Sequence, residues 1–175
     1  MNEHPQWSAW LAQMDTALDD FFTTRPGTDI AALDDPYSAS GFAVLEQWIT
    51  AEFAGLAVLL APANSTVVDR CVRYVGETYR RTCEGEWINS PQAQPGSIRP
   101  AILLPWTRTP LDPQNQVGAA FSRLPARSPQ GQMAGVLDTM TDNHTTWVEL
   151  GRPTPEQYGQ IVVERIVAET DGSEL

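Results

Sequence analysis

The chain of 175 residues contains no lysine, only two histidines and only two cysteines. Every cationic side chain is therefore an arginine, and the phosphate-binding loop that ends in Gly-Lys is excluded. The hydrolase patterns Gly-x-Ser-x-Gly and His-Glu-x-x-His are also missing. His144 has no second His or Cys at the spacing of metal ligands. We therefore predict no catalytic residue, no cofactor and no metal site, and we expect that the chain is not an enzyme.

The sequence also lacks a long apolar segment. A membrane-spanning helix needs about 18 or more apolar residues, and the longest run here, residues 54–63, is interrupted by Gly55 and Pro62. The N-terminus has neither the basic region nor the apolar region of a secretion signal. We expect no membrane partner and a cytoplasmic location.

The two cysteines are not expected to form a disulfide. Cys71 and Cys83 fall on one predicted helix, where twelve residues span about 18 Å. A disulfide needs Cα atoms within roughly 7 Å. We predict two free thiols and a reducing compartment.

Acidic residues outnumber arginines by 22 to 11, and they are unevenly placed. Residues 1–60 hold nine acids and one arginine, and residues 131–175 hold eight acids and two arginines, whereas the arginines dominate residues 61–130. A negative surface repels nucleic acid and attracts cationic partners. We predict a protein partner with a cationic surface and no nucleic acid. If the fold joins the two acidic segments, they form one negative face.

The first two thirds of the chain carry the clearest structural signals. A hydrophobic content of 42% allows one domain over residues 1–175, with residues 1–4 and 171–175 frayed. Apolar spacing, caps and turn residues define the expected elements. We predict helices over 5–22, from Ser38 or Ser40 to Pro62, and from Asn64 or Ser65 to about Cys83 with Gly85 just after its end, a linker over 23–35, and strands at 86–89 and 97–104.

Beyond Pro105 the signals weaken. Asp112-Pro113 starts a short helix through Phe121, and Met133–Met140 is either helix or strand. Thr154-Pro155-Glu156-Gln157 matches a helix-capping pattern, although β-branched residues make a strand the alternative for 155–169. The fold class that we predict is α+β, with three to five helices packed on a small, mainly antiparallel sheet.

Three groups of side chains allow a functional as well as a structural interpretation. Arg70, Arg73, Arg80 and Arg81 lie in i,i+4 register with acids, which favours a self-paired, solvated helix face over an anion site. Asp15, Asp19 and Asp20 could hold Mg²⁺ with a phosphorylated substrate, but we favour a solvated or partner-facing role. Trp106 lies in a proline-rich loop with Arg108, and it either anchors an interface or covers a sheet edge.

The segment Tyr74-Val75-Gly76-Glu77-Thr78-Tyr79-Arg80-Arg81, followed by Gly85-Glu86-Trp87, resembles a pattern in small uncharacterised bacterial α+β proteins. In them a helix reading Tyr-aliphatic-Gly-Glu ends at a glycine and leads into a strand that bears tryptophan. Several are similar to immunity proteins that neutralise secreted polymorphic toxins. The resemblance covers residues 36–104, departs from the pattern at Pro91–Pro100, and implies no catalytic residues.

We predict an immunity-type inhibitor that binds a nuclease or NAD-degrading toxin through an acidic surface and loops. The candidate partner-binding residues are Asp34, Asp35, Tyr37, Trp106 and Arg108. Two alternatives are a non-catalytic accessory or chaperone domain for a secreted protein, and an Mg²⁺-dependent enzyme that uses Asp15, Asp19 and Asp20.

Overall fold

A computed structural model describes residues 5–122, 124–125 and 128–171. The predicted frayed ends lie outside these residues, except for Asp171, which ends the last helix. The segment predicted as one helix over 5–22 is two, because Gln13 leaves helical geometry with φ −92° and ψ 3°. The predicted linker also contains a short helix, which Thr24 caps by accepting a hydrogen bond from the Gly27 N–H. These helices are α1 (Pro5–Ala12), α2 (Met14–Phe22) and α3 (Arg25–Ala31).

The helix α4 (Ala39–Glu52) begins after Ser38, whose hydroxyl accepts from the Gly41 N–H. It ends ten residues earlier than predicted, because Phe53 is extended at φ −117° and ψ 129°. The segment up to the next long helix contains the short helix α5 (Leu56–Leu59) and a single 3₁₀ turn at Pro62–Asn64.

The helix α6 (Ser65–Thr82) lies at the centre of the fold and confirms the predicted helix to within one residue of its end. The residue after its last turn is not the predicted Gly85. Glu84 takes that place and has a positive φ of 53°. Within α6, Gly76 allows the Trp87 ring to lie against the helix, because a Cβ there would overlap the indole.

Two strands, β1 (Glu86–Asn89) and β2 (Pro100–Leu103), form an antiparallel hairpin in which Trp87 pairs with Ile102. The strand at 86–89 is confirmed, and the second is shorter than the predicted 97–104. The helix α7 (Pro113–Ala119) starts as predicted, since Asp112 accepts hydrogen bonds from the Gln114 and Asn115 N–H groups.

The last third of the described chain is helical. The ambiguous segment Met133–Met140 belongs to the long helix α8 (Gln132–Glu149), and residues 155–169 belong to α9 (Pro155–Asp171). The capping pattern is confirmed: Thr154 Oγ1 accepts from the Gln157 N–H, and Gln157 Oε1 accepts from the Thr154 N–H. The strand alternative for 155–169 is therefore wrong.

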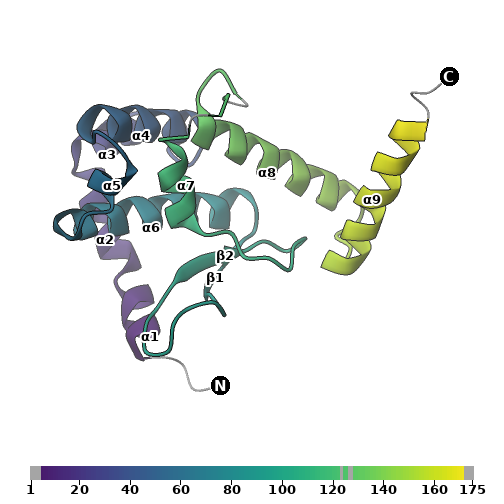
Figure 1. The fold of residues 1–175 in the computed structure, drawn as a ribbon, viewed down its shortest axis with the longest axis horizontal. Coiled ribbons are helices and arrows are strands. Elements are labelled where there is room, and N and C mark those ends of the chain that lie inside the picture. The colour runs from purple at the N-terminus through teal and green to yellow at the C-terminus, as the bar shows by residue number, and fades with distance from the viewer. Residues whose placement is uncertain (1–4, 123, 126–127, 172–175) are drawn as a thin grey trace.

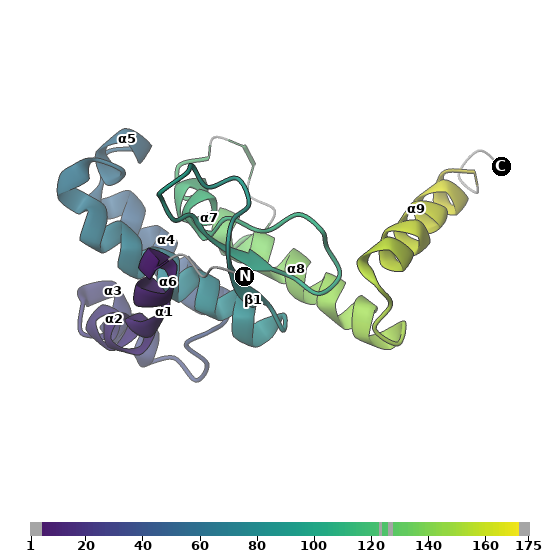
Figure 2. The same cartoon turned by 90° about the horizontal axis from the view of Figure 1, so that it is seen from below.

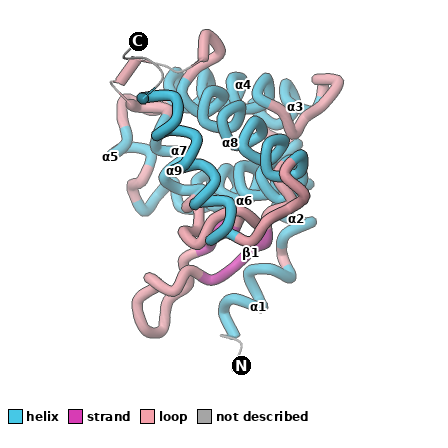
Figure 3. Tube along the Cα trace, turned by 90° about the vertical axis from the view of Figure 1, so that its right-hand side faces the viewer, coloured by secondary structure: helices cyan, strands magenta, loops and turns pink. Residues whose placement is uncertain are grey.

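The predicted α+β class is wrong as well. The described residues contain nine α-helices, eight of them with seven or more residues, and a two-stranded hairpin in place of a helix-covering sheet. Figure 3 shows the two short strands at one side of the helices. The hairpin cannot support three to five helices, so the layers are helix on helix, with α4 along α8 and α6 against α2 and α7. This is a mainly helical fold.

The start of α8 is closed by a residue from α4. The first residue before the helix, Gly131, offers no side-chain cap and has a φ of +123°. Glu46 supplies the cap instead, because its two carboxylate oxygens accept hydrogen bonds from the Gln132 and Met133 N–H groups at 3.0 and 2.8 Å. A carboxylate at a helix N-terminus is also favoured by the helix dipole.

Arg73 is buried in the core side of α6, with 1% of its surface exposed. Its guanidinium lies 4.0 Å from the Trp10 ring centroid and donates to the Trp10 carbonyl oxygen and to Asp69, both at 2.8 Å. The Trp10 indole N–H donates in turn to Asp69. The predicted solvated arginine face is therefore wrong at this position, because α1 covers it.

The other arginines of α6 are paired near the surface. Arg80 and Arg81 both donate to Glu77, which is 4% exposed, and Arg70 donates to Asp20 of α2. Arg80 lies four residues before Glu84, but its ion pair is with Glu77. Burial would raise the pKa of Glu77, but the hydrogen bonds from both arginines outweigh it and hold that pKa below its usual value. These side chains tie α6 together and leave no free arginine cluster among them.

Both cysteines are free and buried, which confirms the two predicted thiols. Burial raises the pKa of Cys71 to about 12 and also raises that of Cys83. Because the thiolate is the reactive form, we expect neither thiol to react with a disulfide reagent at pH 8 in the folded protein. Both should react after denaturation. Rapid modification of one thiol under native conditions would contradict this packing.

Within the described part of the chain, no helix has the length and apolar content that crossing a bilayer requires.

Candidate functional site

A groove of about 450 Å³ lies where the loop before α4, the end of α6 and the middle of α8 meet. Its walls come from Asp35–Ala39, Thr82 and Leu137–Asp142. Segments about a hundred residues apart in the sequence therefore share one concave surface. The groove is the place where the first and last acidic segments of the chain come together.

Three carboxylates line the groove, and all three residues are exposed. Asp35 comes from the loop, and Asp138 and Asp142 follow each other by one turn on α8. Asp35 also accepts a hydrogen bond from the Tyr37 N–H at 2.9 Å, which fixes the shape of the loop. The described residues hold no group of three or more His, Cys, Asp or Glu placed as metal ligands. The three groove carboxylates therefore line the groove without converging on one position where a metal ion would bind.

The hydroxyl groups of the groove are arranged as acceptors. Ser38 Oγ donates to the Asp35 carbonyl at 2.7 Å, Thr82 Oγ1 to the Thr78 carbonyl at 2.8 Å, and Thr141 Oγ1 to the Leu137 carbonyl at 3.0 Å. Since a hydroxyl has one hydrogen to donate, these three oxygens have only lone pairs left for a ligand. Carboxylates and hydroxyls together therefore favour a ligand that donates hydrogen bonds and carries positive charge.

Tyr37 stands at the edge of the groove under a guanidinium. Arg81 lies 4.0 Å from the centroid of the Tyr37 ring, while its charge is balanced by Glu77. Burial raises the pKa of Tyr37 most, Arg81 opposes that, and Asp19 of α2 adds to it.

The structure divides the five predicted partner-binding residues between two places. Asp35 and Tyr37 line the groove, and Asp34 is exposed directly before them. Trp106 and Arg108 instead lie beside α8 and α9. The loop that holds Trp106 and Arg108 therefore does not line the groove.

Trp106 is buried, with 4% of its surface exposed. Its ring centroid lies 5.7 Å from that of His144 and 6.0 Å from that of Trp147, both on α8. The exposed Arg108 side chain forms an ion pair with Glu156 at the start of α9. Trp106 therefore packs in the core and offers no free side chain to a partner, whereas Arg108 stays on the surface with its charge paired by Glu156.

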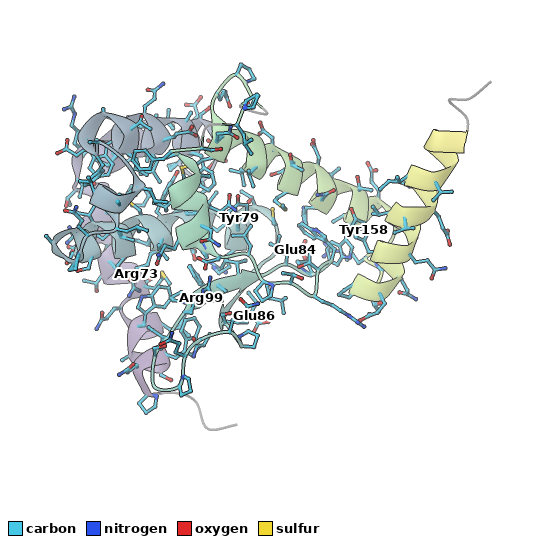
Figure 4. All side chains as sticks on the ribbon, in the orientation of Figure 1. Arg73, Tyr79, Glu84, Glu86, Arg99 and Tyr158 are labelled. Atoms are coloured by element: carbon cyan, nitrogen blue, oxygen red, sulfur yellow. The ribbon has the colours of Figure 1, made fainter. Side chains whose placement is uncertain are left out.

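A polar junction lies next to Trp106, where α6, α8 and the start of α9 approach one another. Glu84 accepts hydrogen bonds from the Arg152 guanidinium, and His144 Nε2 lies 3.2 Å from the same carboxylate. These bonds, the Arg152 contact above all, lower the pKa of Glu84. Figure 4 shows Glu84 near the middle of the molecule and Tyr158 beside α9. The junction joins α9 to the body.

Asp15, Asp19 and Asp20, which suggested an Mg²⁺ site in the sequence, do not share a common contact in the structure. Asp20 accepts a hydrogen bond from Arg70 at 2.6 Å, and Asp15 and Asp19 are exposed on α2. An arginine bound to one of the three carboxylates competes with a cation at that position. The geometry therefore favours the protein-contact interpretation of these residues.

Asp138 and Asp142 were missed by the sequence reasoning, together with Thr82 and Thr141. The signal that could have identified the two carboxylates is their i,i+4 spacing, which places both on one face of a helix. That signal has meaning only once the segment is known to be helical, and the sequence left helix and strand open there.

Comparisons with models of protein families, with curated proteins and with solved structures found no match. The resemblance to immunity proteins stays a prediction.

Proposed function

We propose that this chain is a cytoplasmic, non-enzymatic inhibitor of the immunity type, and that it binds a cationic toxin through the groove between the Asp35–Ala39 loop and α8. The observation that carries the proposal is the groove itself, which is lined by three carboxylates and by three hydroxyl groups whose hydrogens are already donated to backbone carbonyls. The net charge of −11 adds long-range attraction for a basic partner.

An arginine side chain of the partner fits this groove best. Guanidinium carries five N–H donors and no acceptor, so it matches the three carboxylates and the three hydroxyl oxygens of the groove. Toxins that act on RNA, DNA or NAD need positive sites for phosphate. A protein that places carboxylates in such a site both blocks it and speeds the encounter of the two proteins.

The test asks whether a secreted protein encoded beside this gene carries a toxic C-terminal domain that this chain neutralises. Expression of that domain should stop growth, and co-expression of this chain should restore it. In the purified pair, the double variant Asp138→Lys/Asp142→Lys should lower the association rate at least about tenfold and flatten its dependence on salt. Stopped-flow fluorescence at several salt concentrations measures both.

The matched control is Glu52→Lys/Glu86→Lys, which makes the same change of net charge at two exposed residues outside the groove. It should change the rate far less than the groove variant. Equal effects of the two variants would show that only net charge matters and would contradict the groove as the site. If both variants still restore growth and salt does not change the association rate, the accessory or chaperone alternative, which binds apolar segments, would be favoured.

A further inference from the structure

The hairpin has one edge that is paired and one that is open. On the outer side of β2, Ile102 exchanges both of its backbone hydrogen bonds with Leu111, each at 2.8 Å. Ile102 therefore has no backbone group left for Trp87, its partner on β1, so this is a non-hydrogen-bonded pair of the antiparallel ladder. Because bonding alternates along a strand, the N–H and C=O groups of Trp87 and Asn89 point away from β2.

These outward backbone groups are open to a partner. Among the described residues, none of the N–H and C=O groups of Trp87 and Asn89 takes part in a hydrogen bond. Glu86 is exposed, and the other three residues of β1 are partly exposed. Figure 1 shows the hairpin on the side of α6 that faces away from α4, and Figure 2, seen from below, shows it in front of α8. We call the outward groups of Trp87 and Asn89, together with the Glu86 side chain, the β1 edge.

The spacing of the β1 edge selects the shape of its partner. Trp87 and Asn89 lie two residues apart on a strand, so their donors and acceptors repeat at roughly 7 Å. Another extended chain repeats its backbone groups at the same distance, whereas a helix has already bonded its own N–H and C=O groups internally. Two residues with both groups free offer about four main-chain hydrogen bonds to an added strand. The β1 edge therefore fits an extended polypeptide segment.

The charge of the β1 edge selects the composition of that segment. The Glu86 carboxylate forms no ion pair within the described part of the chain. Across two strands an opposite-charge pair is stabilising and a like-charge pair is destabilising. A second copy of this chain would bring another net charge of −11 to the contact, and the two copies would repel each other. A strand with a basic residue beside Glu86 therefore fits the β1 edge, and an acidic strand does not.

We propose that the β1 edge binds an extended, basic segment of another protein, which is added as a strand beside β1. The main chain of the segment supplies the affinity, and a lysine or arginine beside Glu86 supplies the preference for a basic sequence. None of the residues Glu86–Asn89 lines the acidic groove. The two sites are therefore separate, and each proposal stands if the other fails.

A titration with a short basic peptide tests the proposal. The isotope-labelled full chain is mixed with acetyl-Lys-Val-Lys-Val-Lys-amide, and the backbone amide signals are followed by NMR. Saturable shifts should appear at Trp87 and Asn89 and should persist in Asp138→Lys/Asp142→Lys. The amide hydrogens of Trp87 and Asn89 should exchange fast in the free chain and at least about tenfold more slowly in the complex. The peptide with glutamate in place of each lysine should bind at least about tenfold more weakly.

Two variants of Asn89 form the matched pair. Both Asn89→Pro and Asn89→Ala remove the side-chain oxygen that accepts from the Arg99 N–H, but only proline also removes the outward N–H of the edge. Asn89→Pro should therefore bind the basic peptide about threefold to tenfold more weakly than Asn89→Ala. Glu86→Lys leaves the main chain intact and should reduce the preference for the basic peptide at least about threefold.

Several results would overturn the proposal. The absence of saturable shifts at Trp87 and Asn89 at millimolar peptide would do so, and so would slow exchange of these two amides in the free chain, because the edge would then be covered. Equal binding by Asn89→Pro and Asn89→Ala would show that the outward N–H is not used. Shifts that disappear in Asp138→Lys/Asp142→Lys would place the peptide in the groove and not at β1.

Discussion

Replacing Trp106 with alanine should lower the free energy of unfolding by about 4 kcal/mol, within the range for truncating a buried aromatic side chain. The ring is 4% exposed and lies against His144 and Trp147. Alanine leaves a cavity between the loop and α8 that neither neighbour can fill, because Trp147 is held by its N–H bond to the Pro153 carbonyl. Urea unfolding followed by circular dichroism measures the loss.

Arg108→Ala is the control for this prediction, since it changes an exposed residue of the same loop. Its ion pair with Glu156 is on the surface, and such pairs contribute about 0–1 kcal/mol. The comparison separates a structural tryptophan from one that anchors a partner. A loss below about 1 kcal/mol for Trp106→Ala would show that the ring is not part of the core.

The second large effect is expected from Arg73→Met, which should lower the free energy of unfolding by about 3 kcal/mol. Methionine keeps much of the length of the side chain but removes the hydrogen bonds to the Trp10 carbonyl and Asp69, and the cation over the Trp10 ring. The Trp10 carbonyl is then left in a buried place without its donor. Because α1 is fastened to α6 mainly by this cluster, it should loosen first.

Tryptophan fluorescence should report that loosening directly, with a shift toward the emission of exposed indole in Arg73→Met before global unfolding. Arg70→Met is the matched control: Arg70 is on the same helix, but its pair with Asp20 is partly exposed, so the loss should be about 0–1 kcal/mol. If both variants lost the same amount, burial of the Arg73 guanidinium would not be the cause.

The sequence correctly predicted those helices, caps and strands that depend only on residues close to one another in the chain. α6 has an apolar face at strict helical spacing, and its predicted extent is right to within a residue. The Thr154–Gln157 cap and the Asp112 cap were also predicted, because each depends on side chains two or three residues apart. Strand β1 follows from its own short run of residues around Trp87.

The failures have non-local causes. The fold class was wrong mainly because α8 was not recognised, since threonines and glycine interrupt its apolar positions and its packing partner is α4. The buried position of Arg73 depends on α1, which lies some sixty residues earlier. The groove could not be predicted either, because Asp35 meets Asp138 and Asp142 only after α4, α6 and α8 have packed together.

The Glu46 carboxylate that closes the first turn of α8 has a consequence for the order in which the chain folds. Its two hydrogen bonds span 86 and 87 residues, so the loop between α4 and α8 must close before α8 gains its cap. Contacts of such long range slow folding, because the entropy of closing the loop is lost before the contact forms. During synthesis, Glu46 therefore cannot form its two hydrogen bonds until Gln132 and Met133 have been added to the chain. The groove, which needs α8, forms late for the same reason.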